Sequence, residues 1–109
     1  EVVLNYAEAL LKTGDAGNAL TQLNLITAER NAVAHTVADE NTVLLERRRE
    51  LCFEGLRFHD LARTGRDIPL VDAFLQIHGG PAWGSYNFAF PIPVGEMDAN
   101  ASMVQNTGY

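Results

Sequence analysis

The residues best suited to acid–base chemistry lie in one charged segment, from Leu44 to Arg66. Glu46 and Glu50 share one helical face, as a pair of catalytic carboxylates would. Each carboxylate has an arginine neighbour, so structural ion pairing explains the two acids better than general acid–base catalysis. Further acid–arginine pairs follow at the three-residue spacing that brings side chains together on a helix. The predicted structural ion-pair residues are Arg47, Arg48, Glu50, Glu54, Arg57, Asp60 and Arg63.

The remaining polar residues form no pattern that predicts catalysis or metal binding. The histidines are far apart in the sequence and have no further ligand at metal-binding spacing: His35, His59 and His78. Neither of the two serines lies in a nucleophile-elbow motif. The Gly79–Pro81 segment lacks the lysine and the strand–turn–helix context of a phosphate-binding loop. We therefore expect no enzyme activity, no cofactor and no metal.

One glycine-rich loop, residues 79–86, carries two aromatic residues that could contact a ligand. Trp83 and Tyr86 can each stack against the apolar face of a sugar ring. The alternative is that Trp83 anchors the loop, because a large buried aromatic side chain fixes an irregular segment, and we favour this structural role. Two aromatic residues on a loop rarely give more than millimolar affinity once the cost of ordering is counted. We therefore expect oligosaccharide binding by this chain to be weak or absent.

Composition and charge exclude several classes of protein. The net charge of −6 argues against nucleic-acid binding, which requires a basic surface. Hydrophobic residues make up 47% of the chain and charged residues 20%, which is typical of a globular domain and not of a disordered one. No apolar run approaches the roughly 20 residues that span a bilayer. The single cysteine, Cys52, cannot form an intrachain disulfide, and we interpret it as a buried structural thiol.

The elements that must position these residues begin with two predicted helices, residues 2–13 and 17–31. Apolar residues recur at helical spacing in both. Between them, Gly14 supplies a left-handed helix end and Asp15 an N-cap, so we expect a helical hairpin over residues 1–31. Ala7 and Ala19, with Leu23, fall where tetratricopeptide repeats place small residues to let paired helices approach.

The charged segment itself predicts one long helix, residues 41–65, which ends at a glycine and is soon followed by a proline. Its apolar stripe contains Leu44, Arg48, Leu51, Gly55, Phe58 and Ala62. Because Arg48 falls on the packed face, we predict that it is substantially buried and paired with an acceptor. Gly55 lies on the same face and predicts the close approach of another element.

Residues 66–109 form the least regular part of the chain. Apolar spacing predicts a short helix near residues 70–78, followed by a tail rich in glycine and proline. The tail residues expected to wrap onto the helices and complete the core are Phe88, Phe90, Ile92 and Met97. The predicted fold is all-α in a single domain over residues 1–109. It combines a tetratricopeptide-like helical hairpin, a long Arg/Glu-rich helix and an irregular C-terminal tail.

Two separated motifs resemble the SusD/RagB family. The helix of that family commonly reads Glu-Arg-Arg-x-Glu-Leu-x-Phe-Glu-Gly-x-Arg-x-x-Asp-Leu-x-Arg-x-Gly. This chain matches it at Glu46, Arg47, Arg48, Glu50, Leu51, Phe53, Glu54, Gly55, Arg57, Asp60, Leu61, Arg63 and Gly65. The closing pattern of the family is similar to Pro91-Ile92-Pro93, Glu96, Asn100 and Gln105 to Tyr109, with Thr107 in place of the usual proline.

The resemblance implies a surface nutrient-binding lipoprotein. Family members capture oligosaccharides or similar nutrients and pass them to a TonB-dependent, SusC-like transporter in the outer membrane. It also implies lipid anchoring at the cell surface, with ligand contacts made largely outside the helical scaffold. Because the chain opens inside a helix pattern and closes on the family's ending, we expect a C-terminal fragment of a longer protein, without its anchor.

The helical hairpin alone leaves a second class of function open. It also fits a tetratricopeptide-type adaptor that binds protein partners and no nutrient. The arginine-rich helix and the closing motif support only the nutrient-binding protein, so we favour that function, and an enzyme ranks a distant third.

Overall fold

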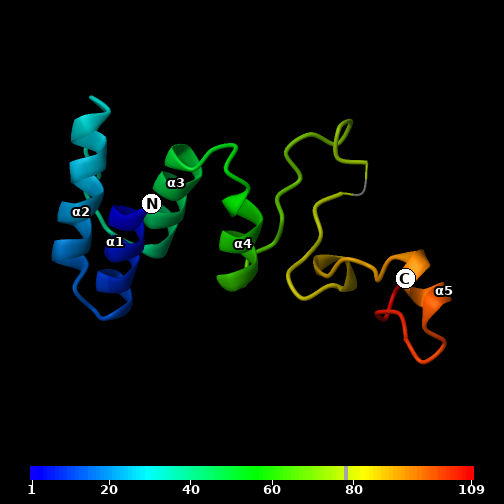
Figure 1. The fold of residues 1–109 in the computed structure, drawn as a ribbon. Coiled ribbons are helices and arrows are strands. Elements are labelled where there is room, and N and C mark those ends of the chain that lie inside the picture. The colour runs from blue at the N-terminus through cyan, green and yellow to red at the C-terminus, as the bar shows by residue number, and fades with distance from the viewer. Residues whose placement is uncertain (78) are drawn as a thin grey trace. The chain divides into compact units, whose positions relative to one another are not determined.

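Five α-helices and one short 3-10 helix form the regular structure in a computed structural model, which describes residues 1–77 and 79–109 (Figure 1). The elements are α1 (Val2–Lys12), α2 (Ala16–Glu29), α3 (Glu40–Glu50), α4 (Leu56–Arg63), the 3-10 helix η1 (Tyr86–Phe88) and α5 (Val94–Ala99). No strand occurs in these described ranges, so the all-α prediction is confirmed. The chain divides into two compact units, Glu1–Arg57 and Phe58–Tyr109.

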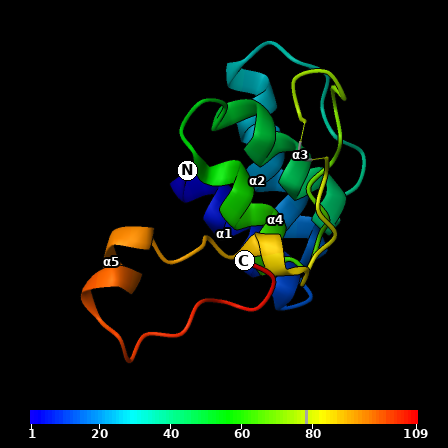
Figure 2. The same cartoon turned by 90° about the vertical axis from the view of Figure 1, so that its right-hand side faces the viewer.

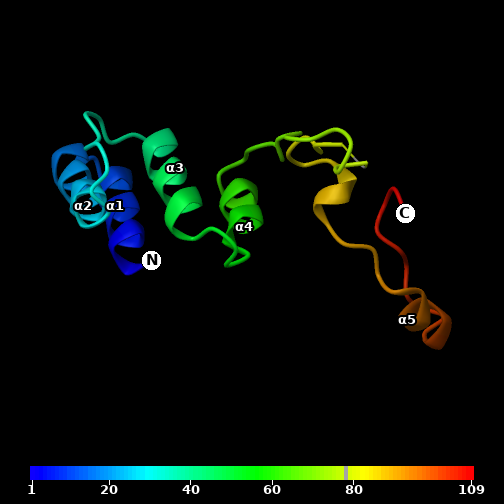
Figure 3. The ribbon, with the colours of Figure 1, turned by 90° about the horizontal axis from the view of Figure 1, so that it is seen from above.

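Helices α1 and α2 form the predicted helical hairpin. They lie side by side and are joined by a short turn (Figures 1 and 3). The buried apolar residues of the hairpin are Leu4, Ala7, Ala19 and Leu23. Two of them are alanines without any exposed surface, and such small side chains let the helix axes approach. Asp15 caps α2, because its carboxylate accepts the backbone N–H of Asn18 at 3.1 Å.

Helix α3 packs against α1 and buries a different face from the predicted one. Arg47 is 5% exposed, and its Nη1 donates to Oδ1 of Asn5 in α1 at 2.6 Å. Arg48, the arginine predicted to be buried, is exposed. The helix begins at a cap from Asp39, whose Oδ1 accepts the N–H of Thr42 at 2.7 Å. The prediction for Arg48 is therefore wrong by one position, and the guanidinium that the core holds belongs to Arg47.

The predicted helix 41–65 is interrupted in the middle, since α3 ends at Glu50 and α4 begins at Leu56. Phe53 and Gly55 have φ angles of 68° and 76°, left-handed conformations that a continuous α-helix excludes. A Cβ atom on Gly55 would meet no atom within 4 Å. The expected close approach at Gly55 is therefore wrong, and the glycine serves the backbone conformation. Cys52 in this turn is exposed, which corrects the expectation of a buried thiol.

In the second unit, the segment that follows α4 is held by side-chain hydrogen bonds and not by a helix. Oε1 of Gln76 accepts the backbone N–H groups of Val71 at 2.6 Å and Asp72 at 3.0 Å. Nε2 of Gln76 donates to the carbonyl of Pro69 at 3.1 Å. These bonds satisfy backbone groups in an irregular turn. The helix predicted near 70–78 is therefore absent from residues 70–77, and His78 lies outside the described residues.

The closing segment of the chain returns on itself through side-chain contacts with the backbone. The chain passes from η1 to α5 and back, so that its end lies near the segment that follows η1 (Figure 2). Gln105 accepts the N–H of Ile92 at 2.8 Å and donates to its carbonyl at 2.9 Å. Asn106 donates to the carbonyl of Phe90 at 2.8 Å. The Gln-Asn pair of the closing motif therefore holds the Pro-Ile-Pro stretch.

The first unit has an apolar core of its own. Its buried members are Leu4, Ala7, Ala19, Leu23, Ala38, Val43 and Leu51. Among the described residues beyond Leu61, none is buried. Phe90 is exposed, and Phe88, Ile92 and Met97 are half-buried, so the predicted packing of the tail onto the helices of the first unit stays a prediction. Phe88 does meet Phe58 of α4, with ring centroids 5.7 Å apart.

Candidate functional site

Trp83 lies on the predicted ligand loop and is held at two points within the second unit. Its indole Nε1 donates to the carbonyl of Ala62 in α4 at 2.9 Å. Its backbone N–H donates to Oδ1 of Asp67 at 2.7 Å. The side chain still exposes 56% of its surface. Trp83 therefore has the contacts of a loop anchor and also an open ring face.

Tyr86 is positioned by the last two residues of the chain. Its ring meets the ring of Tyr109 edge to face, with centroids 5.3 Å apart. Gly108 lies so close to the ring that a Cβ atom there would clash with it. The hydroxyl of Tyr109 donates to the carbonyl of Ala89 at 2.7 Å, which fixes Tyr109 in turn. Tyr86 remains 55% exposed, so a flat ligand could reach it.

The predicted ion-pair residues divide among several environments. Arg63 donates to Oδ1 of Asp60 at 2.8 and 3.1 Å, at the predicted three-residue spacing. Glu50 pairs with Arg30 of the connector after α2, a partner outside the charged segment. The remaining members are the buried Arg47, the exposed Arg48 and Glu54, and the half-buried Arg57.

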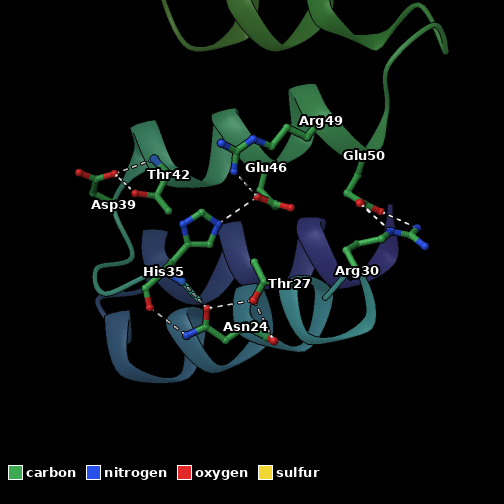
Figure 4. A network of polar contacts seen from close by, with 9 residues as sticks. All are labelled: Asn24, Thr27, Arg30, His35, Asp39, Thr42, Glu46, Arg49 and Glu50. Atoms are coloured by element: carbon green, nitrogen blue, oxygen red, sulfur yellow. Dashed lines mark hydrogen bonds and ion pairs between the residues drawn. The ribbon is translucent and has the colours of Figure 1, made fainter. Parts of the chain in front are cut away.

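A polar network around Glu46, absent from the predicted set, lies between α2, α3 and the connector that joins them (Figure 4). Glu46 is 4% exposed, and its Oε2 contacts Nε2 of His35 at 2.9 Å and Nη1 of Arg49 at 3.3 Å. Asn24 of α2 clamps the backbone of His35, accepting its N–H at 2.8 Å and donating to its carbonyl at 3.0 Å. Thr27 donates to Oδ1 of Asn24 at 3.4 Å. The connector is therefore fixed against both helices.

The Arg30–Glu50 ion pair lies beside this network (Figure 4). The guanidinium donates Nε to Oε1 at 2.9 Å and Nη2 to Oε2 at 2.8 Å, a bidentate arrangement. The hydrogen bonds from Arg30 lower the pKa of Glu50, against a smaller opposing effect of burial. The same bonds raise the pKa of Arg30. Both groups are therefore held in their charged forms.

The network borders an open pocket of about 670 Å³ within the first unit. The residues that line it come from the end of α2, the connector and one face of α3: Arg30, Ala32, Val33, Ala34, His35, Leu45, Glu46, Arg49 and Glu50. In the part of the chain that the structure describes, no group of three or more His, Cys, Asp or Glu residues could hold a metal ion. None of the described helices is both long and apolar enough to cross a membrane.

The match to a known family covers all of this architecture. The model of the SusD family matches residues 1–109, the whole chain. The chain belongs to the SusD family. It is 32% identical over 113 residues to the starch-binding protein SusD of Bacteroides thetaiotaomicron, a match that covers 100% of the chain and 20% of that protein. The chain therefore spans about a fifth of the length of this relative.

A solved structure agrees with the fold of this SusD-family chain. It belongs to a Bacteroides vulgatus protein assigned to sugar binding, with 36% identity and a TM-score of 0.77. The match covers 98% of the chain and 27% of the other protein. The family's Phe-Glu-Gly run falls in the turn between α3 and α4, which explains its glycine by backbone conformation.

The sequence predicts ligand contacts at Trp83 and Tyr86, and none at His35 or Glu46. The structure places Trp83 in a turn and Tyr86 at the start of η1, and it brings Glu46 to His35 across eleven residues of sequence. The only sequence signal for the contact between Glu46 and His35 is a histidine in the connector that precedes the Arg/Glu-rich helix. Such a signal does not specify which carboxylate the imidazole meets.

Proposed function

We propose that this chain is part of the helical scaffold of a glycan-binding lipoprotein at the cell surface. The observation that carries the proposal is the SusD-family match over residues 1–109, together with 32% identity to a starch-binding relative. The relative assigned to sugar binding supports the same class of ligand. In this proposal the whole protein binds its ligand and does not transform it.

The scaffold is proposed to act with a TonB-dependent, SusC-like transporter, to which the whole protein delivers glycan. A lipid anchor in the outer membrane would hold the whole protein beside the transporter. The tetratricopeptide-like hairpin fits this role, because paired helices present a surface to a protein partner. It fits a free-standing adaptor equally well, but the family match favours the glycan-binding protein.

Retention in polysaccharide gels tests the binding function of the full-length protein that contains this chain. We expect its migration in a native gel to slow when starch or another neutral polysaccharide is included, and to stay unchanged with a charged polymer such as polygalacturonate. Bovine serum albumin is the control for non-specific sieving. Equal retention of both proteins across the whole panel would contradict the proposed function.

Isolation from outer membranes tests the partner and the location. An affinity tag at the C-terminus of the full-length protein should recover a TonB-dependent transporter from detergent-solubilised outer membranes. The control replaces the lipid-bearing cysteine that the proposal places near the N-terminus of the full-length protein by alanine, which should shift the protein into the soluble fraction. Recovery of cytoplasmic proteins in place of a transporter would favour the adaptor.

A further inference from the structure

We propose that the pocket beside Glu46 is a binding site for a neutral sugar of one or two residues. The proposal rests on the proposed function, because it takes the ligand class from it, and it adds a site within this chain. The pocket volume of about 670 Å³ lies within the range of roughly 300–1,000 Å³ that is common for small-molecule sites. All of its lining residues belong to the first unit.

Glu46 has one carboxylate oxygen that can accept a hydrogen bond from a ligand. Oε2 of Glu46 contacts both His35 and Arg49, whereas no donor among the described residues contacts Oε1 (Figure 4). Glu46 is nonetheless 4% exposed and lines the pocket. This oxygen is not one of the buried side-chain atoms that lack a partner, so it is open to the space of the pocket. A hydroxyl group in the pocket can donate to it.

The charges of the lining residues favour a neutral ligand. Two guanidinium groups, those of Arg30 and Arg49, face two carboxylates, those of Glu46 and Glu50, and each is already in an ion pair. An added cation or anion would meet a like charge as well as an opposite one. A sugar hydroxyl donates and accepts at the same time, so it can bridge a carboxylate and a guanidinium without adding charge.

The shape and rigidity of the lining also favour a sugar. Apolar side chains of the connector and α3 supply a surface for the C–H faces of a sugar ring: Ala32, Val33, Ala34 and Leu45. Asn24 holds the connector in place through both backbone groups of His35. A fixed wall lowers the ordering cost of binding. Because the lining contains no phenylalanine, tyrosine or tryptophan, the expected affinity is in the millimolar range.

Titration of the ¹⁵N-labelled chain with maltose tests the site by NMR. We expect saturable amide shifts in residues 32–35 and 45–50, with a dissociation constant in the millimolar range. Glucose should bind at the same residues. Glucose 6-phosphate and protonated glucosamine should bind more weakly than glucose. No saturable shift in these residues up to about 50 mM maltose, a concentration far above that range, would overturn the proposal.

Neighbouring arginines provide a matched pair of variants. Arg49→Gln removes a guanidinium that lines the pocket, and we expect binding to weaken by about tenfold or more. Arg48→Gln makes the same charge change at an exposed position outside the lining, and we expect it to bind as the wild type does. Glu46→Gln should also weaken binding, and circular dichroism confirms the fold of each variant. Equal loss in the two arginine variants would contradict the pocket.

Two further results separate this inference from the proposed function. Trp83→Ala should leave maltose binding by the chain unchanged, and shifts centred on residues 83–86 would overturn the pocket. If the full-length protein is retained by polysaccharide but the pocket residues do not shift, the inference fails and the proposed function stands. If the chain binds maltose in the pocket but the full-length protein is retained by no polysaccharide, the proposed function fails and the pocket stands.

Discussion

Arg47 joins α3 to α1 from a buried position. Its side chain is 5% exposed and donates to Asn5 at 2.6 Å. Arg47→Ala would leave a cavity and remove the donor to a part-buried amide oxygen, so we expect a loss of about 2–4 kcal/mol in the free energy of unfolding. Urea denaturation followed by circular dichroism measures this loss. Arg48→Ala removes an exposed arginine from the same helix and should change stability by less than about 0.5 kcal/mol. Equal losses of stability in the two variants would contradict the burial of Arg47.

The Arg30–Glu50 pair predicts a small dependence of stability on pH. The pKa of Glu50 lies below its ordinary value of 4.5, so its stabilising effect is present above that value and is lost as the pH falls through the lowered pKa. Arg30 is largely exposed, so solvent screens the pair and we expect only a small contribution to stability. Glu50→Gln should flatten the stability curve of the chain below pH 4.5 relative to the wild type.

A double-mutant cycle isolates this pair from the other acids of the chain. Arg30→Gln removes the partner that lowers the pKa of Glu50, so it should flatten the same part of the curve. Combining it with Glu50→Gln should then add little further change. Independent, additive effects of the two substitutions on the pH slope would show that the pair is not coupled.

At the scale of elements, the hairpin was predictable and the charged helix was only partly so. The hairpin has a local signal for each feature: apolar spacing, a glycine turn and the Asp15 cap. In the charged segment, apolar residues recur at helical spacing on both sides of the break. The predicted apolar stripe crosses this break as if the helix were continuous. Because α3 ends at Glu50, the buried positions follow Val43, Arg47 and the C-cap Leu51, each four residues apart. The break therefore explains the one-residue error at Arg48.

The break between α3 and α4 depends on the backbone conformation of Gly55. Its φ of 76° lies in the left-handed region, and there is open space around it. Gly55→Ala should therefore destabilise the chain through backbone strain alone, by about 1–2 kcal/mol. Gly17 in α2 has room for a Cβ atom and no left-handed backbone, so Gly17→Ala should be neutral or stabilising by up to about 1 kcal/mol. Thermal unfolding compares the two. A stabilising Gly55→Ala would mean that α3 and α4 can join into one helix.

The candidate sites show where prediction from sequence stops. Two aromatic residues in a glycine-rich segment, Trp83 and Tyr86, are visible in the sequence itself, and their role as ligand contacts stays a prediction. The Glu46 network was not, because it depends on the connector folding back over α3. That path is set by two hydrogen bonds between Asn24 and the backbone of His35, and neither residue carries a recognisable motif.

At the scale of the whole molecule, burial and hydrogen bonding are unevenly divided. The buried apolar cluster lies in α1, α2, α3 and the residues beside them, whereas no described residue beyond Leu61 is buried. The tail is held mainly by side-chain bonds to exposed backbone, such as those of Gln105 and Asn106. Amide exchange follows local opening, which is easiest where few apolar contacts must be broken.

Hydrogen exchange followed by mass spectrometry should therefore separate the two parts of the chain. We expect peptides from α1 and α2 to exchange slowly, at rates that follow global unfolding, and peptides from residues 79–109 to exchange much faster. Gln105→Ala removes both bonds to Ile92 and should speed exchange in residues 86–109 without changing α1 or α2. Equal protection of the tail and the hairpin would contradict this division, because slow tail exchange requires burial that the described residues beyond Leu61 do not have.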